Sequence, residues 1–391
     1  MKVALIHDHL AQDGGAEKVL KALAELFPNA PIYTLLYEKK HVNRYFKNRC
    51  IKTSIIQRLP FGIKYYQWYL PFMPIAVEFF DLTEYDLVIS DASAFAKGVI
   101  TSPHALHICY CHAPTRYLWD YTHKYITELQ YNKYFKKIIS LVLNYIRIWD
   151  RTAADRVDKY ITNSKYVKEK IKKYYQHSST VIYPPVEIDK FYISQNLFYN
   201  NQQENYFLVG ARIVPYKRID IVIQAFKILN SCKNSEKPYR TASVQQGKKF
   251  KLKIFGDGID MERIKKIAGD DKNIEFLGYI VDDKIKAELY SNCLAFIYPQ
   301  EEDFGITAVE AMASGRPVMA FNKGGAVETV VEGKTGIFFN KQTPEAIAET
   351  VKNFIPSDFN PQEIREHSKQ FSKERFKKQI LEFISKYQIR N

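Results

Sequence analysis

The sequence lacks the features that define several common protein classes. Its five cysteines are an odd count in a chain of 391 residues, so a disulfide framework is not expected. No apolar run approaches the roughly 18 residues that a membrane-spanning helix needs. The opening residues MKVALIHDHL are interrupted by His and Asp and do not form the apolar segment of a signal peptide. These absences predict a reduced, cytoplasmic protein without a membrane span.

Several nucleotide-binding patterns are also missing. There is no Asp-x-Asp triplet to hold a divalent metal against a diphosphate, and no Walker loop. Gly14-Gly15-Ala16-Glu17 and Gly256-Asp257-Gly258 are incomplete as dinucleotide fingerprints, which disfavours an NAD-dependent oxidoreductase. The basic residues are scattered through both halves with no recognised nucleic-acid-binding motif, which disfavours a DNA- or RNA-binding protein.

What the chain does have is length and positive charge. A chain of 391 residues exceeds what one hydrophobic core usually accommodates, so two domains are expected. Lys and Arg number 57 against 43 Asp and Glu, for a net charge of +14. This charge favours anionic partners such as phosphorylated small molecules or an anionic membrane surface.

Short apolar runs alternate with amphipathic helical stretches along the chain. The runs are continuously hydrophobic, which is typical of parallel strands covered on both faces by helices, as in a doubly wound α/β fold. The predicted strands are Met1–Ile6, Asp86–Ser90, Ala105–Cys111, Lys159–Thr162, Thr180–Tyr183, Tyr206–Gly210, Lys251–Phe255, Ile274–Leu277, Cys293–Tyr298 and Pro317–Ala320. The predicted helices are Ala16–Leu26, Asp220–Leu229, Met261–Ile267, Asp283–Tyr290, Ile306–Ser314 and Ser372–Tyr387.

The stiff Pro184-Pro185 pair predicts a domain boundary near residues 185–200. We therefore expect an N-terminal domain over 1–190, a second domain over 191–370, and a C-terminal helix in 371–391 that packs back on the first domain. Ligands of such folds bind at the carboxyl ends of the strands, so a cleft between two facing domains is expected to hold the site. The polar stretch Asn230–Lys249 is interpreted as a surface insertion.

Two carboxylates stand out around the predicted helix Ile306–Ser314. Glu310 lies in a run of small and apolar residues, and no basic residue three or four positions away on the same helix can pair with it. A buried carboxylate needs donors, and the diol of a ligand would supply them. Glu302, in the preceding loop, could bind a further hydroxyl of the same ligand. The alternative is that a cation from elsewhere in the fold satisfies Glu310.

Cations and glycines follow other predicted strands. Arg212 and Lys217 flank a strand-to-helix turn, which suits a diphosphate, although a solvated basic turn is the alternative. Gly14 and Gly15 precede a helix and could present backbone amides to an anion.

Histidines follow strands as well. His112 comes directly after the strand that contains Cys109 and Cys111, and it suits a polar contact with substrate. A metal site built from the two cysteines and His107 is conceivable, but no second ligand pair at zinc-like spacing occurs. His7-Asp8-His9 forms a further polar group at the end of the first predicted strand.

Taken together and in this order, these groups resemble the family 4 retaining glycosyltransferases of the GT-B fold. The resemblance covers nearly the whole chain. It rests on an E-x7-E pair at Glu302 and Glu310 with Phe304-Gly305, on Gly210-Ala211-Arg212 with Lys217, on Gly256-Asp257-Gly258, and on Gly315-Arg316-Pro317 with Gly324-Gly325 and Glu328.

The resemblance implies a role for each position. Arg212 and Lys217 would neutralise the diphosphate of a nucleotide sugar in place of a metal ion, and Gly14 and Gly15 would present amides to the distal phosphate. Glu310 would hold the ribose. The transferred sugar would be bound by Glu302 and His112, assisted by the backbone amides of the segment Phe304, Gly305, Ile306 and Thr307. Transfer would retain the anomeric configuration, by front-side displacement through an oxocarbenium-like state, with no cofactor.

Two stretches resemble a branch of the family that often uses GDP-mannose, namely Tyr110–Tyr117 and Val214–Asp220. The alternatives are a UDP-sugar donor and a non-catalytic glycosyltransferase-like partner subunit. The aromatic segment Leu59–Leu82 and the basic, apolar segment Tyr131–Trp149 suit an anionic membrane surface, although both could simply pack in the core. We therefore expect a peripheral enzyme on the cytoplasmic face of the inner membrane. Its acceptor would be a polyprenyl-diphosphate-linked saccharide in O-antigen, capsule or exopolysaccharide synthesis.

Overall fold

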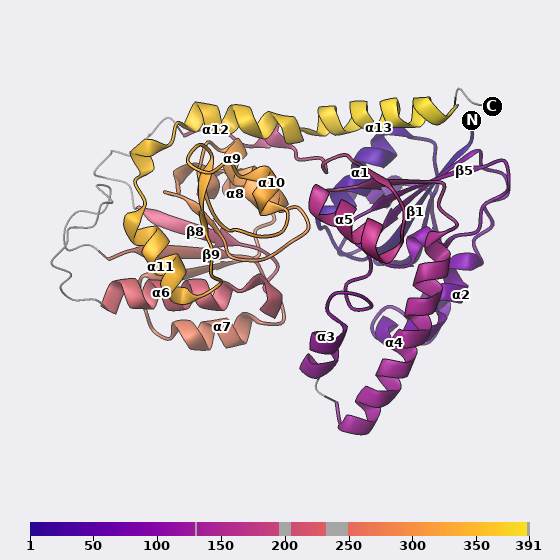
Figure 1. Cartoon of the computed structure of the whole chain (residues 1–391), viewed down its shortest axis with the longest axis horizontal. Coiled ribbons are helices and arrows are strands. Elements are labelled where there is room, and N and C mark those ends of the chain that lie inside the picture. The colour runs from indigo at the N-terminus through magenta and orange to yellow at the C-terminus, as the bar shows by residue number, and fades with distance from the viewer. Residues whose placement is uncertain (130, 195–204, 232–248, 389–391) are drawn as a thin grey trace. The chain divides into compact units, whose positions relative to one another are not determined.

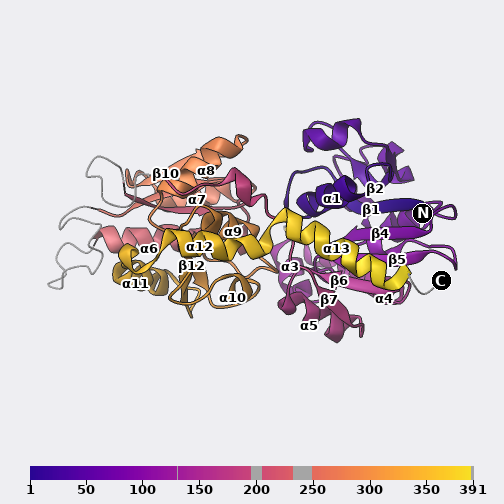
Figure 2. The ribbon, with the colours of Figure 1, turned by 90° about the horizontal axis from the view of Figure 1, so that it is seen from above.

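The computed structural model describes residues 1–129, 131–194, 205–231 and 249–388 (Figures 1 and 2). The chain divides into two compact units. The first unit comprises Met1–Pro185 together with the chain from Phe376 onward, and the second comprises Val186–Arg375. Most of the stretch interpreted as an insertion, Asn230–Lys249, lies outside the described residues.

The first unit contains a seven-stranded parallel sheet in the order β3-β2-β1-β4-β5-β6-β7. Its strands are β1 (Val3–Leu10), β2 (Ile32–Tyr37), β3 (Ile51–Thr53), β4 (Leu87–Ala92), β5 (Leu106–Cys111), β6 (Lys159–Thr162) and β7 (Ser179–Val181). Its α-helices are α1 (Gly15–Leu26), α2 (Met73–Glu78), α3 (Thr122–Glu128), α4 (Lys133–Ala154) and α5 (Lys165–Tyr174). Short 3-10 helices cover Arg44–Asn48, Ile55–Arg58, Tyr66–Phe72 and Ala96–Gly98.

The second unit contains a six-stranded parallel sheet in the order β10-β9-β8-β11-β12-β13. Its strands are β8 (Tyr206–Gly210), β9 (Lys251–Phe255), β10 (Ile274–Gly278), β11 (Phe296–Tyr298), β12 (Val318–Phe321) and β13 (Gly336–Phe339). Its α-helices are α6 (Ile219–Ser231), α7 (Met261–Ala268), α8 (Asp283–Asn292), α9 (Ile306–Ala313), α10 (Ala326–Thr329), α11 (Pro344–Asn353) and α12 (Pro361–Ser368). Short 3-10 helices cover Ile188–Lys190, Pro215–Lys217, Pro356–Asp358 and Lys369–Phe371.

The predicted α/β architecture with two doubly wound sheets is confirmed. Three strands, β2, β3 and β13, were not expected from the sequence. The first strand is longer than predicted, because residues up to Leu10 still pair with β2. His7, Asp8 and His9 therefore lie within β1 and not beyond its end.

The sheet of the first unit is buried on both faces, as continuous hydrophobicity predicts. Successive β1 residues point to opposite faces. Ala4 and Ile6 belong to one hydrophobic core, which includes residues of α2, α4 and α5, whereas Leu5 belongs to the other, which includes residues of α1. Among the described residues, no helix is both long enough and apolar enough to cross a bilayer.

The last helix, α13 (Lys373–Gln388), supplies its apolar side chains to the first unit. Phe376 and Ile380 are one turn apart, and both are buried with residues of β1 and α1. The Phe376 ring meets the edge of Tyr110 on β5 at a centroid distance of 5.7 Å. Lys377 pairs with Glu25 of α1 at 2.6 Å. The chain thus completes the core of its first unit with its last helix.

This packing predicts that Phe376→Ala destabilises the first unit. Phe376 is 0% exposed, and emptying such a site costs about 3–5 kcal/mol of unfolding free energy. The matched control is Leu381→Ala on the same helix, because Leu381 is 47% exposed and its truncation should cost much less. Urea unfolding of the two variants checks this. If both variants lost the same unfolding free energy, the buried face of α13 would contribute no more to stability than its exposed face.

Candidate functional site

Two loops at the carboxyl edge of the second sheet are fastened to each other. Ile213, after β8, donates its backbone N–H to Asp257 O after β9 at 2.8 Å. Gly256 has φ +124°, and a Cβ there would lie 1.9 Å from Ala211 O. Only glycine permits both this conformation and this approach. The glycine turn therefore fixes the loop that contains Arg212 and Lys217.

The two cations in that loop have different surroundings. Lys217 ends a short 3-10 helix, is 9% exposed, and forms an ion pair with Glu302 Oε1. Arg212 is exposed, and its Nη2 lies 3.4 Å from Tyr216 Oη. The solvated basic turn considered above therefore does not describe Lys217, whose side chain is largely out of water.

Glu302 is held on both sides of its carboxylate. Besides Lys217 at Oε1, Tyr298 donates to Oε2 at 2.6 Å and Gln300 Nε2 lies 3.3 Å from the same oxygen. Burial and the Glu302 charge raise the pKa of Tyr298 well above its usual value, so the phenol keeps the proton that it donates. The backbone is fixed as well, because Gly325 N donates to Glu302 O at 2.7 Å.

Helix α9 begins directly after this loop. Gly305 is its N-cap, in the left-handed conformation at φ +98°, and a Cβ there would lie 2.7 Å from Tyr298 Oη. Phe304 and Gly305 are buried, whereas Ile306 and Thr307 in the first turn are partly exposed. Ala308 donates its N–H to Gly305 O at 3.1 Å, whereas the amides of Ile306 and Thr307 precede the first hydrogen bond of the helix and suit a polar ligand.

Glu310, on α9, is 1% exposed and has a cation from another helix beside it. Lys286 of α8 pairs with Glu310 Oε2 at 2.5 Å, and Tyr290 Oη lies 3.2 Å from the same oxygen. Of the two possibilities raised by the sequence, the structure therefore shows the second, in which a cation from elsewhere in the fold pairs with Glu310. Any diol bound at Glu310 would share this carboxylate with Lys286.

In the first unit, His112 contacts a buried group of titratable side chains. His112 Nε2 lies 2.6 Å from Asp91 Oδ1, and His7 Nδ1 lies 2.9 Å from Asp91 Oδ2. His7 Nε2 lies 3.6 Å from Glu17 Oε1. Burial alone would lower the pKa of His7, but its contacts with Asp91 and Glu17 outweigh burial and raise it to about 10. Despite burial, the two imidazoles hold the pKa of Asp91 below its usual value.

Gly14 and Gly15 stand at the start of α1, beside the same group. Gly14 is the N-cap, and its N–H donates to Glu17 Oε2 at 2.9 Å. Gly15 is the first residue of the helix. Glu17 therefore links the helix start to His7. This connection joins Gly14 and His112, which the sequence suggested separately.

Two of the remaining polar candidates of this unit, Asp8 and His107, have structural partners. Asp8 accepts hydrogen bonds from four consecutive backbone N–H groups, Ser93 to Ala96, at 2.6 to 2.8 Å. His107 Nε2 lies 2.9 Å from Ser90 Oγ, and burial lowers the pKa of His107 to about 4. No group of three or more His, Cys, Asp or Glu side chains suited to a metal ion occurs within the described ranges.

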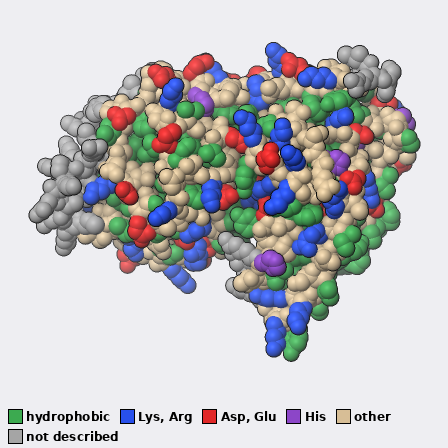
Figure 3. All heavy atoms as spheres, in the orientation of Figure 1, with side chains coloured by type: hydrophobic (Ala, Val, Ile, Leu, Met, Phe, Trp, Pro, Cys, Tyr) green, Lys and Arg blue, Asp and Glu red, His purple; other side chains and the backbone are tan. Residues whose placement is uncertain are grey.

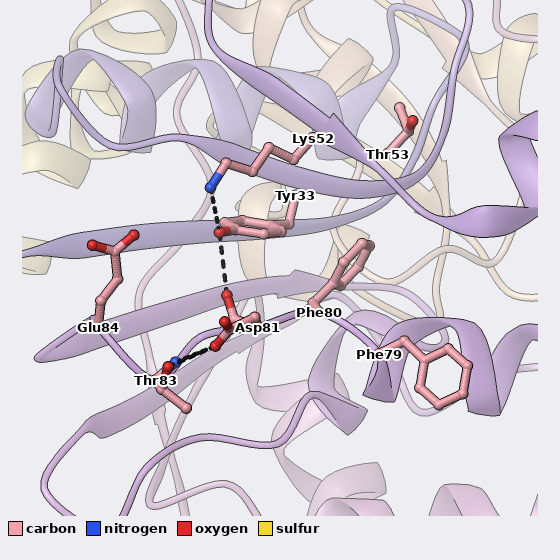
Figure 4. A pocket seen from close by; sticks show the side chains of 8 residues that line it. All are labelled: Tyr33, Lys52, Thr53, Phe79, Phe80, Asp81, Thr83 and Glu84. Carbon is pink, nitrogen blue, oxygen red and sulfur yellow. Dashed lines mark hydrogen bonds between the residues drawn. The ribbon is translucent and has the colours of Figure 1, made fainter.

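A pocket of about 340 Å³ lies elsewhere in the first unit (Figure 4). Its lining comes from β2, β3 and the segment after α2, and it includes none of the site residues expected from the sequence. Lys52 Nζ donates to Tyr33 Oη at 2.8 Å, and Tyr33 Oη in turn donates to Asp81 O at 3.3 Å. Several polar groups of this pocket are thus bonded to one another, and we assign the pocket no role in catalysis.

Comparison with known families agrees with this arrangement. The model described as Glycosyltransferase Family 4 matches residues 13–190, and the model described as Glycosyl transferases group 1 matches residues 195–377. The chain belongs to glycosyltransferase family 4. The first match ends at residue 190 and the second begins at residue 195, and together they include every site residue expected from the sequence.

Individual relatives of this family 4 chain are distant. An uncharacterized glycosyltransferase of Methanocaldococcus jannaschii is 28% identical over 58% of this chain and 58% of its own length. The α-1,3/1,6-mannosyltransferase ALG2 of Dictyostelium discoideum is 28% identical over 76% of this chain and 73% of its own. The capsular polysaccharide biosynthesis glycosyltransferase CapM of Staphylococcus aureus is 28% identical over 50% of each chain. The match thus spans little more than half the length of the archaeal relative and half that of CapM.

Among solved structures, Anabaena HepE in complex with UDP has the same fold. It superposes with a TM-score of 0.64 at 18% identity, covering 99% of this chain and 100% of that one. The GT-B architecture expected from the sequence is therefore confirmed for this glycosyltransferase.

The residues of the site that were missed from the sequence include Asp91, Tyr298 and Lys286. Asp91 directly follows a predicted strand, and this strand lies between the strands that contain or precede His7 and His112. Its position at a strand end could have identified Asp91 as a candidate. Tyr298 ends β11 just before the Glu302 loop. Lys286 stands in a charged helix and carries no distinguishing pattern.

The raised pKa of His7 predicts a pH-dependent loss of stability. Between the ordinary His pKa of about 6.5 and the folded value of about 10, the folded state holds one more proton than the unfolded state. Unfolding free energy should therefore fall as pH rises, by up to about 1.4 kcal/mol per pH unit for one proton. His7→Gln should show a flatter profile from pH 7 to 10 in urea unfolding.

The matched control for this comparison is His177→Gln. His177 also pairs with an aspartate, Asp155 at 2.8 Å, but on the surface. Its replacement should leave the pH profile as in the unchanged protein. Parallel profiles for all three proteins would contradict the proton assignment at His7.

Proposed function

We propose that the protein is a retaining hexosyltransferase that uses a nucleotide sugar, with GDP-mannose as the preferred donor. Its proposed acceptor is a polyprenyl-diphosphate-linked saccharide in bacterial surface polysaccharide synthesis, and its proposed place is the cytoplasmic face of the inner membrane. The observation that carries the proposal is the Lys217–Glu302 ion pair beside the start of α9. It combines a cation, a carboxylate and helix N–H groups at the carboxyl edge of a parallel sheet, where such folds bind ligands.

In this proposal Lys217 and Arg212 bind the diphosphate. Two cations suffice to offset the charge that grows on a departing nucleoside diphosphate, so the reaction needs no divalent metal. Lys217 would leave Glu302 for a phosphate oxygen. Glu302 would then accept hydrogen bonds from hydroxyls of the sugar, with the first-turn amides of α9 assisting.

Glu310 is proposed to bind the ribose. Lys286 and Tyr290 both contact Oε2 of this buried carboxylate, so Oε1 is the oxygen proposed to accept hydrogen bonds from the diol. In the first unit, Gly14 and Gly15 are proposed to bind the distal phosphate, and His112 the transferred sugar.

The identity of the donor sugar rests on relatives. ALG2 of Dictyostelium is named a mannosyltransferase, and CapM is named for capsular polysaccharide biosynthesis. The alternative donor is a UDP-sugar, since HepE was solved with UDP. The two alternatives differ in the base, so direct binding of nucleotides separates them.

Titration calorimetry with GDP, UDP, ADP, GDP-mannose and NADH tests the donor. We expect GDP and GDP-mannose to bind, and we expect the affinity of each to be the same in EDTA as in magnesium. Lys217→Ala should weaken GDP binding about tenfold or more, because a hydrogen bond to a charged group contributes about 1.5–3 kcal/mol. Lys265→Ala, at an exposed lysine of α7, is the matched control and should bind as before.

The outcomes of this titration are distinct. Preference for UDP would replace the donor but keep the transferase. Strict dependence on magnesium would overturn the metal-free diphosphate site. Binding of NADH alone would overturn the proposed function.

The membrane proposal rests on helix α4. Its buried side chains include Leu143, Ile146 and Trp149. A second apolar row, spaced alternately by four and three residues, is exposed instead: Tyr134, Ile138, Leu141, Tyr145 and Ile148. Such spacing places all five on one helix face.

Basic side chains accompany this exposed row. Lys133, Lys136 and Lys137 stand in the first turns of α4. Figure 3 shows Lys and Arg beside hydrophobic side chains at the end of the molecule where Figure 1 places the start of α4. Exposed aromatic residues also occur between the third and fourth strands, among them Phe61, Trp68 and Phe79. Exposed apolar side chains with cations at one end of the row match the chemistry of an anionic lipid surface.

Vesicle sedimentation tests this surface. We expect the protein to bind vesicles containing anionic phospholipid at low salt and to dissociate as salt rises, because the attraction to headgroups is screened. Leu141→Glu should weaken binding severalfold, since Leu141 is 72% exposed on this row. Ile259→Glu is the control, at an 89% exposed apolar residue of the second unit. If the protein does not sediment with vesicles at low salt, the membrane part of the proposal is wrong. If the protein instead forms concentration-dependent dimers that Leu141→Glu abolishes, the exposed row of α4 binds a second copy of the chain.

A further inference from the structure

Asp91 is a buried carboxylate to which neither the sequence nor the proposed function gives a role. It is 1% exposed and stands in β4, between β1 and β5 in the sheet. The parallel register pairs Asp91 with His7 of β1. His112 follows β5 directly and donates its backbone N–H to Ala92 O at 2.9 Å. Three adjacent strands thus deliver His7, Asp91 and His112 to one place.

We propose that Asp91 is a positioning residue that sets the ring orientation and tautomer of His112. An ionised carboxylate only accepts hydrogen bonds, so the 2.6 Å contact requires His112 Nε2–H as donor. Nδ1 is then the ring nitrogen that meets the substrate. This inference rests on the proposed function, in which His112 contacts the transferred sugar.

The carboxylate of Asp91 can act as a clamp because both of its oxygens are engaged. Oδ1 is in contact with His112 Nε2, and Oδ2 is in contact with His7 Nδ1. Rotation of the carboxylate about the Cβ–Cγ bond of Asp91 would therefore break both contacts. His7 is fixed in turn by Glu17, which is 2% exposed and also accepts the N–H of Gly14. A side chain that is locked by its own neighbours holds the next one within the tolerance that catalysis needs.

The charges of the group favour this arrangement. The two carboxylates, Asp91 and Glu17, both lie beside the imidazole of His7, whose raised pKa keeps that ring protonated, so part of their negative charge is compensated inside the fold. His9 and Asp8 are the further titratable neighbours on β1. Burial lowers the pKa of His9, which keeps that ring neutral beside His7. Asp8 is bound to the four backbone N–H groups after β4.

The tautomer is measured directly by long-range ¹H–¹⁵N NMR on protein with labelled histidine. The chain has nine histidines, and the His112→Ala spectrum identifies the His112 signals. We expect a protonated Nε2 in the unchanged protein and a mixture of tautomers in Asp91→Asn. A His112 ring protonated at Nδ1 alone in the unchanged protein overturns the proposal, with no variant required. An unchanged His112 signal in folded Asp91→Asn overturns it as well.

A double-mutant cycle measures the effect on turnover. Asp91→Asn should lower kcat about tenfold or more, while KM for the donor changes less than about threefold, because the clamp acts on orientation. In a His112→Ala background the same change should have no further effect on kcat. An equal effect in both backgrounds would falsify the assignment to His112. Asp155→Asn, which removes the carboxylate of the surface pair with His177, is the matched control and should leave kcat as it was.

The two proposals fail in different ways. Absence of sugar transfer in the unchanged protein, with an intact Nε2–H tautomer, would overturn the proposed function and keep the positioning by Asp91. Normal sugar transfer, with an Asp91→Asn effect that does not depend on His112, would overturn the positioning by Asp91 and keep the proposed function.

Discussion

The buried and half-buried carboxylates described above all have cations or N–H groups within hydrogen-bond distance. A carboxylate that leaves water without such partners would take up a proton instead. Asp8 has four backbone N–H groups, and this solution fixes a loop. Asp91, Glu302 and Glu310 instead have imidazoles, lysines and phenols, whose side chains can exchange partners. The kind of donor thus separates a structural carboxylate from one that suits a binding site.

Parallel strands bring these side chains together, and glycines let the loops between them touch. Gly256 and Gly305 have positive φ values, and a Cβ at either would collide with a neighbouring loop or with Tyr298. Gly324 and Gly325 approach the Glu302 loop in the same way, where a Cβ would lie 2.4 Å from Glu302 O or from the Cα of Phe304. These are the glycines of the patterns that the sequence showed. Their spacing along the chain therefore reflects contacts between successive strand ends.

The sequence revealed the repeated pattern more readily than the pairing of side chains. The continuous apolar run Tyr206–Gly210 was located to the residue, because every residue of that strand is buried. Lys251–Phe255 was also located to the residue, although its two lysines are partly exposed. β13 was missed, since the short Gly336–Phe339 segment has two partly exposed residues and begins with glycine. Glu310 was expected to be buried, but its partner Lys286 comes from another helix. Such a pairing depends on how α8 packs against α9, and no local pattern encodes it.

The ion pairs of the second unit also constrain which ligand suits the site. A simple anion that drew Lys217 away would leave the half-buried Glu302 with Tyr298 and Gln300 but without its cation, and the cost of that charge would oppose binding. A nucleotide sugar brings phosphate oxygens for Lys217 and hydroxyl groups for Glu302 in one molecule, so both members of the broken pair regain partners. The same reasoning applies to Glu310, where a ribose diol adds donors without displacing Lys286. In the proposed function, selectivity for a sugar donor over free phosphate follows from this exchange, because only the complete donor satisfies both charges at once.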